Sequence, residues 1–165
     1  MEHRAYVVQA PDVMPFTTDA NRWQSQVIIG PDGAKSEHLY VTRFTLRAGK
    51  QLSGHAHTPG KGDEAYFILR GHAKLEIAPE IGSSEREIHQ VGPETVIFIP
   101  AGTFHRLDNT EGTEDLVLLT LWNSPPVPGS NGIHDARLKA WGTTFRMASE
   151  AAGPVADSHD GKEAP

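Results

Sequence analysis

Short apolar runs rich in Val, Ile, Leu, Phe and Tyr recur along this chain, and Gly, Pro, Asn or Asp residues separate them. Turn signals at such regular intervals, roughly every eight to twelve residues, are typical of an all-β barrel or sandwich. The runs predict strands at Gln26–Ile29, His38–Leu46, Gly54–His57, Glu64–Arg70, Ala73–Ala78, Glu87–Val91, Thr95–Ile99, Thr103–Leu107 and Leu116–Trp122. The pattern therefore predicts an all-β fold.

The two ends of the chain differ from this β-rich middle. After the last strand, a stiff Pro-rich connector leads into a predicted short helix, Ile133–Trp141, which ends at Gly142. Its expected apolar contacts are Ile133, Leu138 and Trp141. We therefore expect an N-terminal arm that lies on a partner subunit (1–20), a barrel (21–123), a connector with a helix (124–147) and a disordered tail of small and polar residues (148–165).

Two histidines one residue apart are the first candidates for chemistry. Because side chains alternate along a strand, His55 and His57 project from the same face and aim at one point. Glu64 opens the following strand, and His105 follows a Pro-x-Gly turn. Imidazole nitrogens and a carboxylate oxygen suit a divalent transition metal. The candidate metal ligands are therefore His55, His57, Glu64 and His105.

The spacing of these residues resembles the two motifs of the cupin superfamily. Gly49, His55, His57, Glu64 and Gly71 match the first motif, and Pro100, Gly102, His105 and Asn109 match the second. Two features depart from the family pattern. The spacer from residue 58 to 63 is longer than usual, and Glu94 stands where the family has glycine. The resemblance implies a double-stranded β-helix, or jelly-roll, barrel with one short C-terminal helix. The chain contains no second copy of the two motifs, so we expect one barrel and not a tandem pair.

Each ligand candidate also has a simpler interpretation. The histidine pair could be two partly exposed residues on an edge strand, Glu64 a surface carboxylate, and His105 a plug of the barrel interior. Their joint occurrence at matching positions favours a metal site. His134 is a further residue of interest, since the C-terminal segment could fold back over a barrel mouth.

Strand alternation also nominates cavity walls. If Glu64 faces inward, so does Tyr66, a candidate proton donor. Arg43 interrupts an apolar strand, where an inward cation would need a partner such as a substrate carboxylate or enolate. An outward Arg43 on a solvated face is an equally good interpretation, because Tyr40, Thr42 and Phe44 could form the core side instead. Tyr66 and Arg43 are the candidate catalytic residues.

Three imidazoles and one carboxylate would leave about two positions of an octahedral ion open, as a catalytic metal requires. This openness favours Fe(II), with Mn(II), Ni(II) or Zn(II) as alternatives. The cupin resemblance then implies an oxygenase, here a dioxygenase acting on a small chelating substrate. Two alternatives remain: an isomerase, lyase or cyclase that uses the ion as a Lewis acid, and a barrel that binds small molecules without catalysis.

Composition restricts the partners of the protein. The formal charge of −6 and the lack of a basic stripe disfavour nucleic-acid binding. The apolar runs are too short to cross a membrane. The first fifteen residues lack the apolar core of a secretory signal, which predicts a cytoplasmic protein. No cysteine is present, so disulfides and thiolate ligands are excluded. The resemblance implies a homodimer.

Overall fold

The computed structural model describes residues 5–58, 62–129 and 131–152. In this part of the chain, nine strands and one α-helix are formed. The strands are β1 (Trp23–Ile29), β2 (Tyr40–Leu46), β3 (Lys50–Gln51), β4 (Glu64–Arg70), β5 (Ala73–Ala78), β6 (Glu87–Val91), β7 (Val96–Ile99), β8 (Phe104–Asn109) and β9 (Leu116–Trp122); the helices are α1 (Gly132–Trp141) and the short 3₁₀ turns η1 (Ala10–Asp12) and η2 (Ala148–Ala152).

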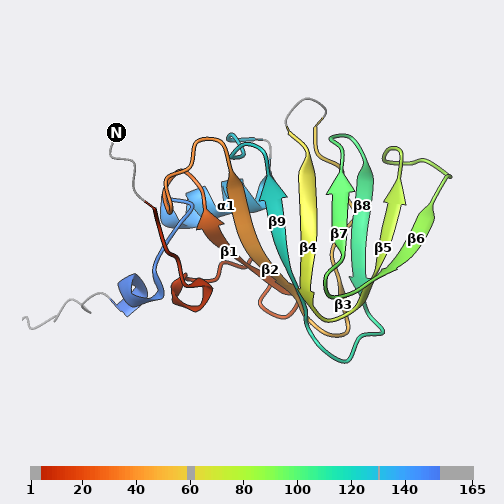
Figure 1. The fold of residues 1–165 in the computed structure, drawn as a ribbon, viewed down its shortest axis with the longest axis horizontal. Helices are drawn as coiled ribbons and strands as arrows, with labels where there is room; N and C mark the ends of the chain where they lie inside the picture. The colour runs from red at the N-terminus through yellow and green to blue at the C-terminus, as the bar shows by residue number, and fades with distance from the viewer. Residues whose placement is uncertain (1–4, 59–61, 130, 153–165) are drawn as a thin grey trace, which may run out of the picture.

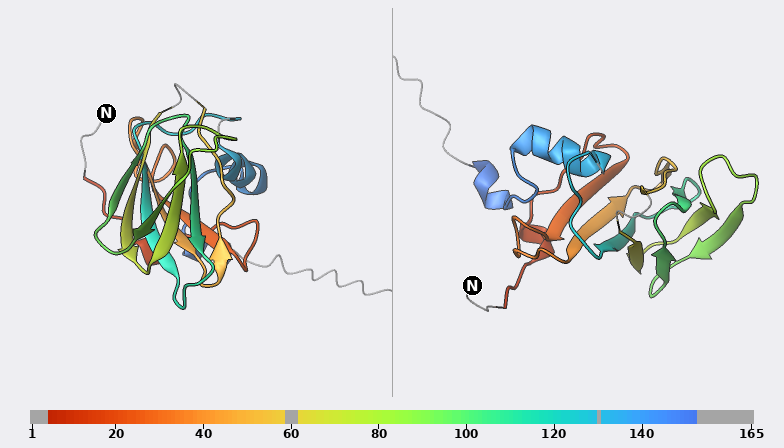
Figure 2. Two further views of the ribbon diagram at one scale, coloured as in Figure 1. Left: turned by 90° about the vertical axis from the view of Figure 1, so that its right-hand side faces the viewer. Right: turned by 90° about the horizontal axis from the view of Figure 1, so that it is seen from above.

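The strands form two antiparallel sheets that face each other (Figures 1 and 2). One sheet has the order β1-β2-β9-β4-β7, and the other has the order β3-β8-β5-β6. Each sheet also pairs strands that are far apart in sequence: β9 lies between β2 and β4, and β8 lies between β3 and β5. The expected all-β jelly-roll with one short helix is therefore confirmed.

The core lies between the two sheets and follows the alternation of side chains. On β4, Tyr66 and Ile68 point inward, and on β9 Leu116 and Leu118 do so from the adjacent strand. Inward residues of the second sheet, such as Leu75, complete the same cluster. Burial of these side chains on the period-two face is the main stabilising term of the fold.

One predicted strand is not formed. In the segment Gly54–His57, only His55 pairs with a neighbour, through an isolated bridge to His105. The backbone N–H groups of His55 and His105 donate to each other's carbonyls at 3.1 and 2.9 Å. Gly54 lies directly against the Phe104 ring, where a Cβ would come within 2.4 Å of Phe104 Cζ. The segment is thus extended but joins the sheet at a single residue.

The helix matches the prediction within one residue. The Asn131 side chain accepts a hydrogen bond from the His134 N–H at the first turn, and Gly142 ends the helix with φ of 71°. Ile133 and Trp141 pack against the core as expected, whereas Ala136 takes the place expected for Leu138. Figures 1 and 2 show α1 beside β1, at the opposite end of the sandwich from β6.

The N-terminal arm, as far as it is described, packs on its own barrel. Val13 and Phe16 are buried, and Phe16 belongs to the main core cluster. Gln26 on β1 donates from Nε2 to the carbonyls of Ala10 and Val13, both at 2.8 Å. Residues 148–152 of the expected tail form η2, whereas residues 1–4 and 153–165 lie outside the described residues. The described part contains no helix long and apolar enough to span a bilayer.

Two turn positions explain the motif glycines. Gly71, between β4 and β5, has φ of +81°, and a Cβ there would lie 2.5 Å from the carbonyl oxygen of Asp115. Glu94, at the position where the cupin motif has glycine, adopts φ of +67°. The backbone thus keeps the left-handed conformation even though the side chain is not glycine, which costs conformational energy.

Candidate metal centre

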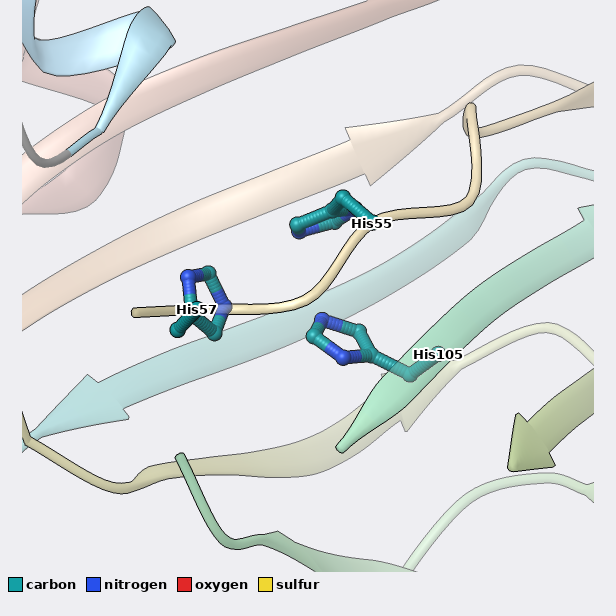
Figure 3. Close-up of side chains that lie close together, drawn as sticks. All are labelled: His55, His57 and His105. Carbon is teal, nitrogen blue, oxygen red and sulfur yellow. The ribbon is translucent and has the colours of Figure 1, made fainter. Parts of the chain in front are cut away.

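Three histidine side chains converge inside the barrel (Figure 3). His105 lies on β8, and His55 and His57 lie on the extended segment that passes beside it. One ring nitrogen of each lies within 4.8 Å of those of the other two. The predicted convergence of these three residues is therefore present, although they come from a bridged segment and a strand rather than from two strands.

Backbone carbonyls orient two of the rings. Nδ1 of His55 lies 3.0 Å from the Ser53 carbonyl oxygen, and Nδ1 of His105 lies 3.0 Å from that of Thr103. A carbonyl only accepts, so each Nδ1 carries the proton and donates it. This tautomer leaves the Nε2 lone pair of each ring available to a cation, which is the usual arrangement of histidine ligands.

The electrostatic environment also suits a metal ion. His105 Nε2 is buried and has no hydrogen-bond partner in the described part of the chain. Burial, with the neighbouring His55 and His57, lowers the pKa of His105 to about 3, and burial also lowers the pKa of His55. Both rings are therefore neutral near pH 7, as metal ligation requires. The orphaned nitrogen and the tautomers fit a divalent transition metal.

Glu64 lies at the edge of this cluster. Its Oε2 accepts a hydrogen bond from His57 Nε2 at 2.7 Å and lies 3.7 Å from His105 Nε2. Its other oxygen, Oε1, accepts a hydrogen bond from Trp122 Nε1 at 2.9 Å. The carboxylate is thus held against the histidines from the side of β9. It is positioned either to bind the ion directly or to orient His57.

The two candidate catalytic residues have different surroundings. Tyr66 is buried beside the site: its ring centroid lies 5.9 Å from that of His105, and its hydroxyl contacts the Glu64 carboxylate. Burial, and then the charge of Glu64, raise the pKa of Tyr66 well above its usual range. Arg43 is not brought to the site, because its side chain lies on the other face of β2 and donates to Gln26 Oε1 at 2.9 Å.

The histidines His55 and His57 line a cavity with a volume of about 80 Å³. Glu64, Tyr66 and Trp122 line one wall, and the inward side chains of β2 another. Arg137, from α1, lines it as well. The sequence-based reasoning did not single out this arginine. A signal was present, because Ile133, Arg137 and Trp141 are four residues apart on one helix face.

Comparison with known proteins gives structural but not sequence matches. No family model and no curated protein matches the chain. A predicted oxalate decarboxylase from Thermotoga maritima matches with a TM-score of 0.58 and 20% identity, over 73% of this chain and 100% of the other. The polyketide cyclase RemF from Streptomyces resistomycificus matches with a TM-score of 0.58 and 20% identity, over 83% and 94%.

A third match is to a longer protein. The oxalate decarboxylase of Lactobacillus farciminis matches with a TM-score of 0.59 and 20% identity over 70% of this chain, but this chain spans only 32% of that one. At such identities, the likeness establishes the fold alone. The protein therefore has the cupin fold in the form of one small barrel, with a three-histidine cluster suited to a divalent metal ion.

Proposed function

We propose that this protein is a metal-dependent enzyme that acts on a small, oxygen-chelating substrate. The observation that carries the proposal is the convergence of three ring nitrogens, with the free Nε2 of His105 buried and unpartnered in the described structure. His55, His57 and His105 would hold the ion, with Glu64 as the fourth ligand or as the partner of His57. A cavity beside two of these histidines gives the substrate a place to bind.

Within this class, we propose an oxygenase that uses Fe(II). Three imidazoles and one carboxylate leave positions open on an octahedral ion, and they are a ligand set suited to iron. When bound, the ion would supply a binding point for the substrate oxygens and, as ferrous iron, for dioxygen. The protein would exclude bulk water, since His57, Glu64 and His105 are buried.

A second reaction class is favoured by the contact between Tyr66 and Glu64. A buried phenol hydroxyl beside a carboxylate holds a proton at the cavity wall, where it can be given to a substrate carbanion or alkoxide. Such a proton donor serves an isomerase, lyase or cyclase that needs the ion only as a Lewis acid. A decarboxylase and a cyclase are among the proteins of like fold.

One experiment distinguishes these classes. Protein purified anaerobically and reloaded with Fe(II) or Mn(II) would be mixed with a panel of α-keto acids, β-diketones and catechols in an oxygen electrode. Dioxygen uptake that requires both substrate and Fe(II) supports the oxygenase. Oxygen-independent turnover that Tyr66→Phe slows about 10²- to 10⁴-fold, at unchanged metal content, supports the Lewis-acid class. Substrate binding unaffected by a chelator, without turnover, contradicts both.

We also propose that two copies of the chain associate. On β7, the inward residues Ile97 and Ile99 are buried, whereas the outward residues Val96 and Phe98 remain 66% and 65% exposed. Large apolar side chains gathered on an edge strand favour a protein contact over contact with water. Light scattering should give the mass of a dimer for the wild type and of a monomer for Phe98→Glu.

A further inference from the structure

Arg137 places a positive charge in the cavity wall. It lies in the middle of α1, and its side chain is 2% exposed, although it lines the same cavity as His55, His57 and Glu64. A guanidinium remains charged at any physiological pH. The C-terminal helix therefore carries a buried cation to the cavity that the metal-site histidines also line.

This cation has no counter-charge from the described residues. In the described ranges, none of the ion pairs includes Arg137. Among the described residues, Glu64 is the one carboxylate that lines the cavity, and it is engaged by His57 and Trp122. Asp135, on the same helix as Arg137, accepts hydrogen bonds from a backbone N–H of the connector.

The groups that do bond Arg137 are neutral. Nη1 donates to the Tyr40 hydroxyl at 3.1 Å, and Nη2 donates to Ser25 Oγ at 2.9 Å. Burial raises the pKa of Tyr40, so its hydroxyl keeps its proton and supplies no negative charge. Nε is buried and has no partner within the described structure. Since a guanidinium carries five N–H donors, these two bonds leave most of the donor set free.

Such an arrangement is costly for an empty cavity and favourable for an anion. A desolvated charge without a counter-charge destabilises the fold, whereas a planar carboxylate can take two parallel N–H···O bonds from a guanidinium. We propose that Arg137 is the anion-recognition residue of this cavity and that the substrate carries a carboxylate that docks on it. The further statement that the other end of the substrate binds the metal ion at the histidines rests on the proposed metal-dependent function.

The remaining walls define the size and polarity of the ligand. Thr42 and Thr120, on adjacent strands, line the cavity with a hydrogen-bonded pair of hydroxyls 2.8 Å apart. Phe44 and Leu118 add apolar surface beside them. The class of ligand that fits is a small carboxylic acid with a short carbon skeleton and an oxygen donor at the end remote from the carboxylate.

The test compares acids with their amides. Malonate, succinate and glutarate would be titrated calorimetrically into Mn(II)-loaded protein beside their monoamides, which keep the shape but lose one negative charge. At the length that spans the cavity, the diacid should bind at least about tenfold more tightly than its monoamide. In metal-free protein, propionate should raise the melting temperature and propionamide should not. A wild type without either preference overturns the proposal.

Variants separate anion binding from a merely structural role. Arg137→Gln should bind the diacid no more tightly than its monoamide and should not be stabilised by propionate, while it keeps its Mn(II) affinity. Arg137→Lys keeps the positive charge but not the planar pair of N–H donors, so most of the preference for acids over amides should be lost. Arg43→Gln, on the other face of the barrel wall, is the matched arginine control and should behave as wild type.

The outcomes also separate this inference from the proposed function. If no metal binds but propionate stabilises the wild type and not Arg137→Lys, the anion site stands and the metal-dependent function fails. If Mn(II) binds but acids and amides are equal, the anion site fails and the metal site stands. If Arg137→Gln does not fold, the comparison of acids with amides on the wild type and on Arg137→Lys still tests the anion site. A folded Arg137→Gln that keeps the acid preference overturns the proposal.

Discussion

His57 Nε2 lies 2.7 Å from Glu64 Oε2, and both side chains are buried. The contact joins a residue of the irregular segment after β3 to the first residue of β4. Because the other carboxylate oxygen accepts from Trp122, Glu64 cannot turn away without breaking a second hydrogen bond. The Glu64 carboxylate therefore ties His57 to two neighbouring strands of the five-stranded sheet, β4 and β9.

Glu64→Gln should weaken Mn(II) binding about 10- to 100-fold, whether Glu64 is a ligand or the residue that orients His57. The amide keeps the size of the side chain, so the fold should persist. Calorimetric titration of Mn(II) into wild type and variant measures the ratio, and circular dichroism checks the fold. Equal affinities would show that Glu64 has neither role.

Glu94→Gly should stabilise the protein. The left-handed φ of +67° costs a non-glycine residue about 1–2 kcal/mol, and glycine avoids that strain at an unfolded-state entropy cost of roughly 0.5–1 kcal/mol. The expected gain in the free energy of unfolding is about 0.5–1 kcal/mol, measured by urea denaturation.

The matched control is Glu37→Gly, since Glu37 is also exposed but does not have a positive φ. There, glycine only adds conformational freedom to the unfolded chain, so the free energy of unfolding should fall by roughly 0.5–1 kcal/mol. A Glu94→Gly protein as unstable as Glu37→Gly would mean that the turn is not strained.

Asp32→Ala should destabilise the protein near pH 7, with a difference that vanishes in acid. Asp32 Oδ2 accepts hydrogen bonds from the Thr144 N–H and hydroxyl and from the Thr143 hydroxyl, which tie the segment after α1 to the barrel. The Thr144 hydroxyl and N–H lower the pKa of Asp32 below its ordinary 3.8. Its stabilising effect is therefore complete above the unfolded-state pKa and is lost as the pH falls through the lower folded-state pKa.

Urea denaturation of the wild type and Asp32→Ala at several pH values measures this effect. The difference in free energy of unfolding should be about 1 kcal/mol at neutral pH, since the group is partly exposed, and should shrink below about pH 4. A difference that stays constant down to pH 2 would contradict a role for the carboxylate charge.

The sequence predicted the parts of the structure that depend on short-range pattern. The period-two alternation of β4 and β9, the turn at Gly71 and the cap at Gly142 all follow from local backbone preferences. The meeting of His55, His57 and His105 followed from motif spacing, because the residues between the two motifs had to form the strands that bring them together.

Features that depend on packing could not be predicted in the same way. Alternation placed Arg43 and its neighbours on opposite faces of β2 but did not say which face was inward, since both carry apolar residues. Arg137 was missed because the path of the connector decides which helix face meets the barrel. The strand expected at Gly54–His57 became a single bridge where the Phe104 ring packs on Gly54.

The central claim is that His55, His57 and His105 together hold one divalent metal ion. The most direct measurement is metal quantification of anaerobically purified wild type and His105→Ala, after both are loaded with Fe(II) or Mn(II) and desalted. The wild type should retain about one equivalent, and His105→Ala should retain almost none while it keeps the circular dichroism spectrum of a folded barrel. A wild type that retains no metal, or a folded variant that retains as much as the wild type, would contradict the claim.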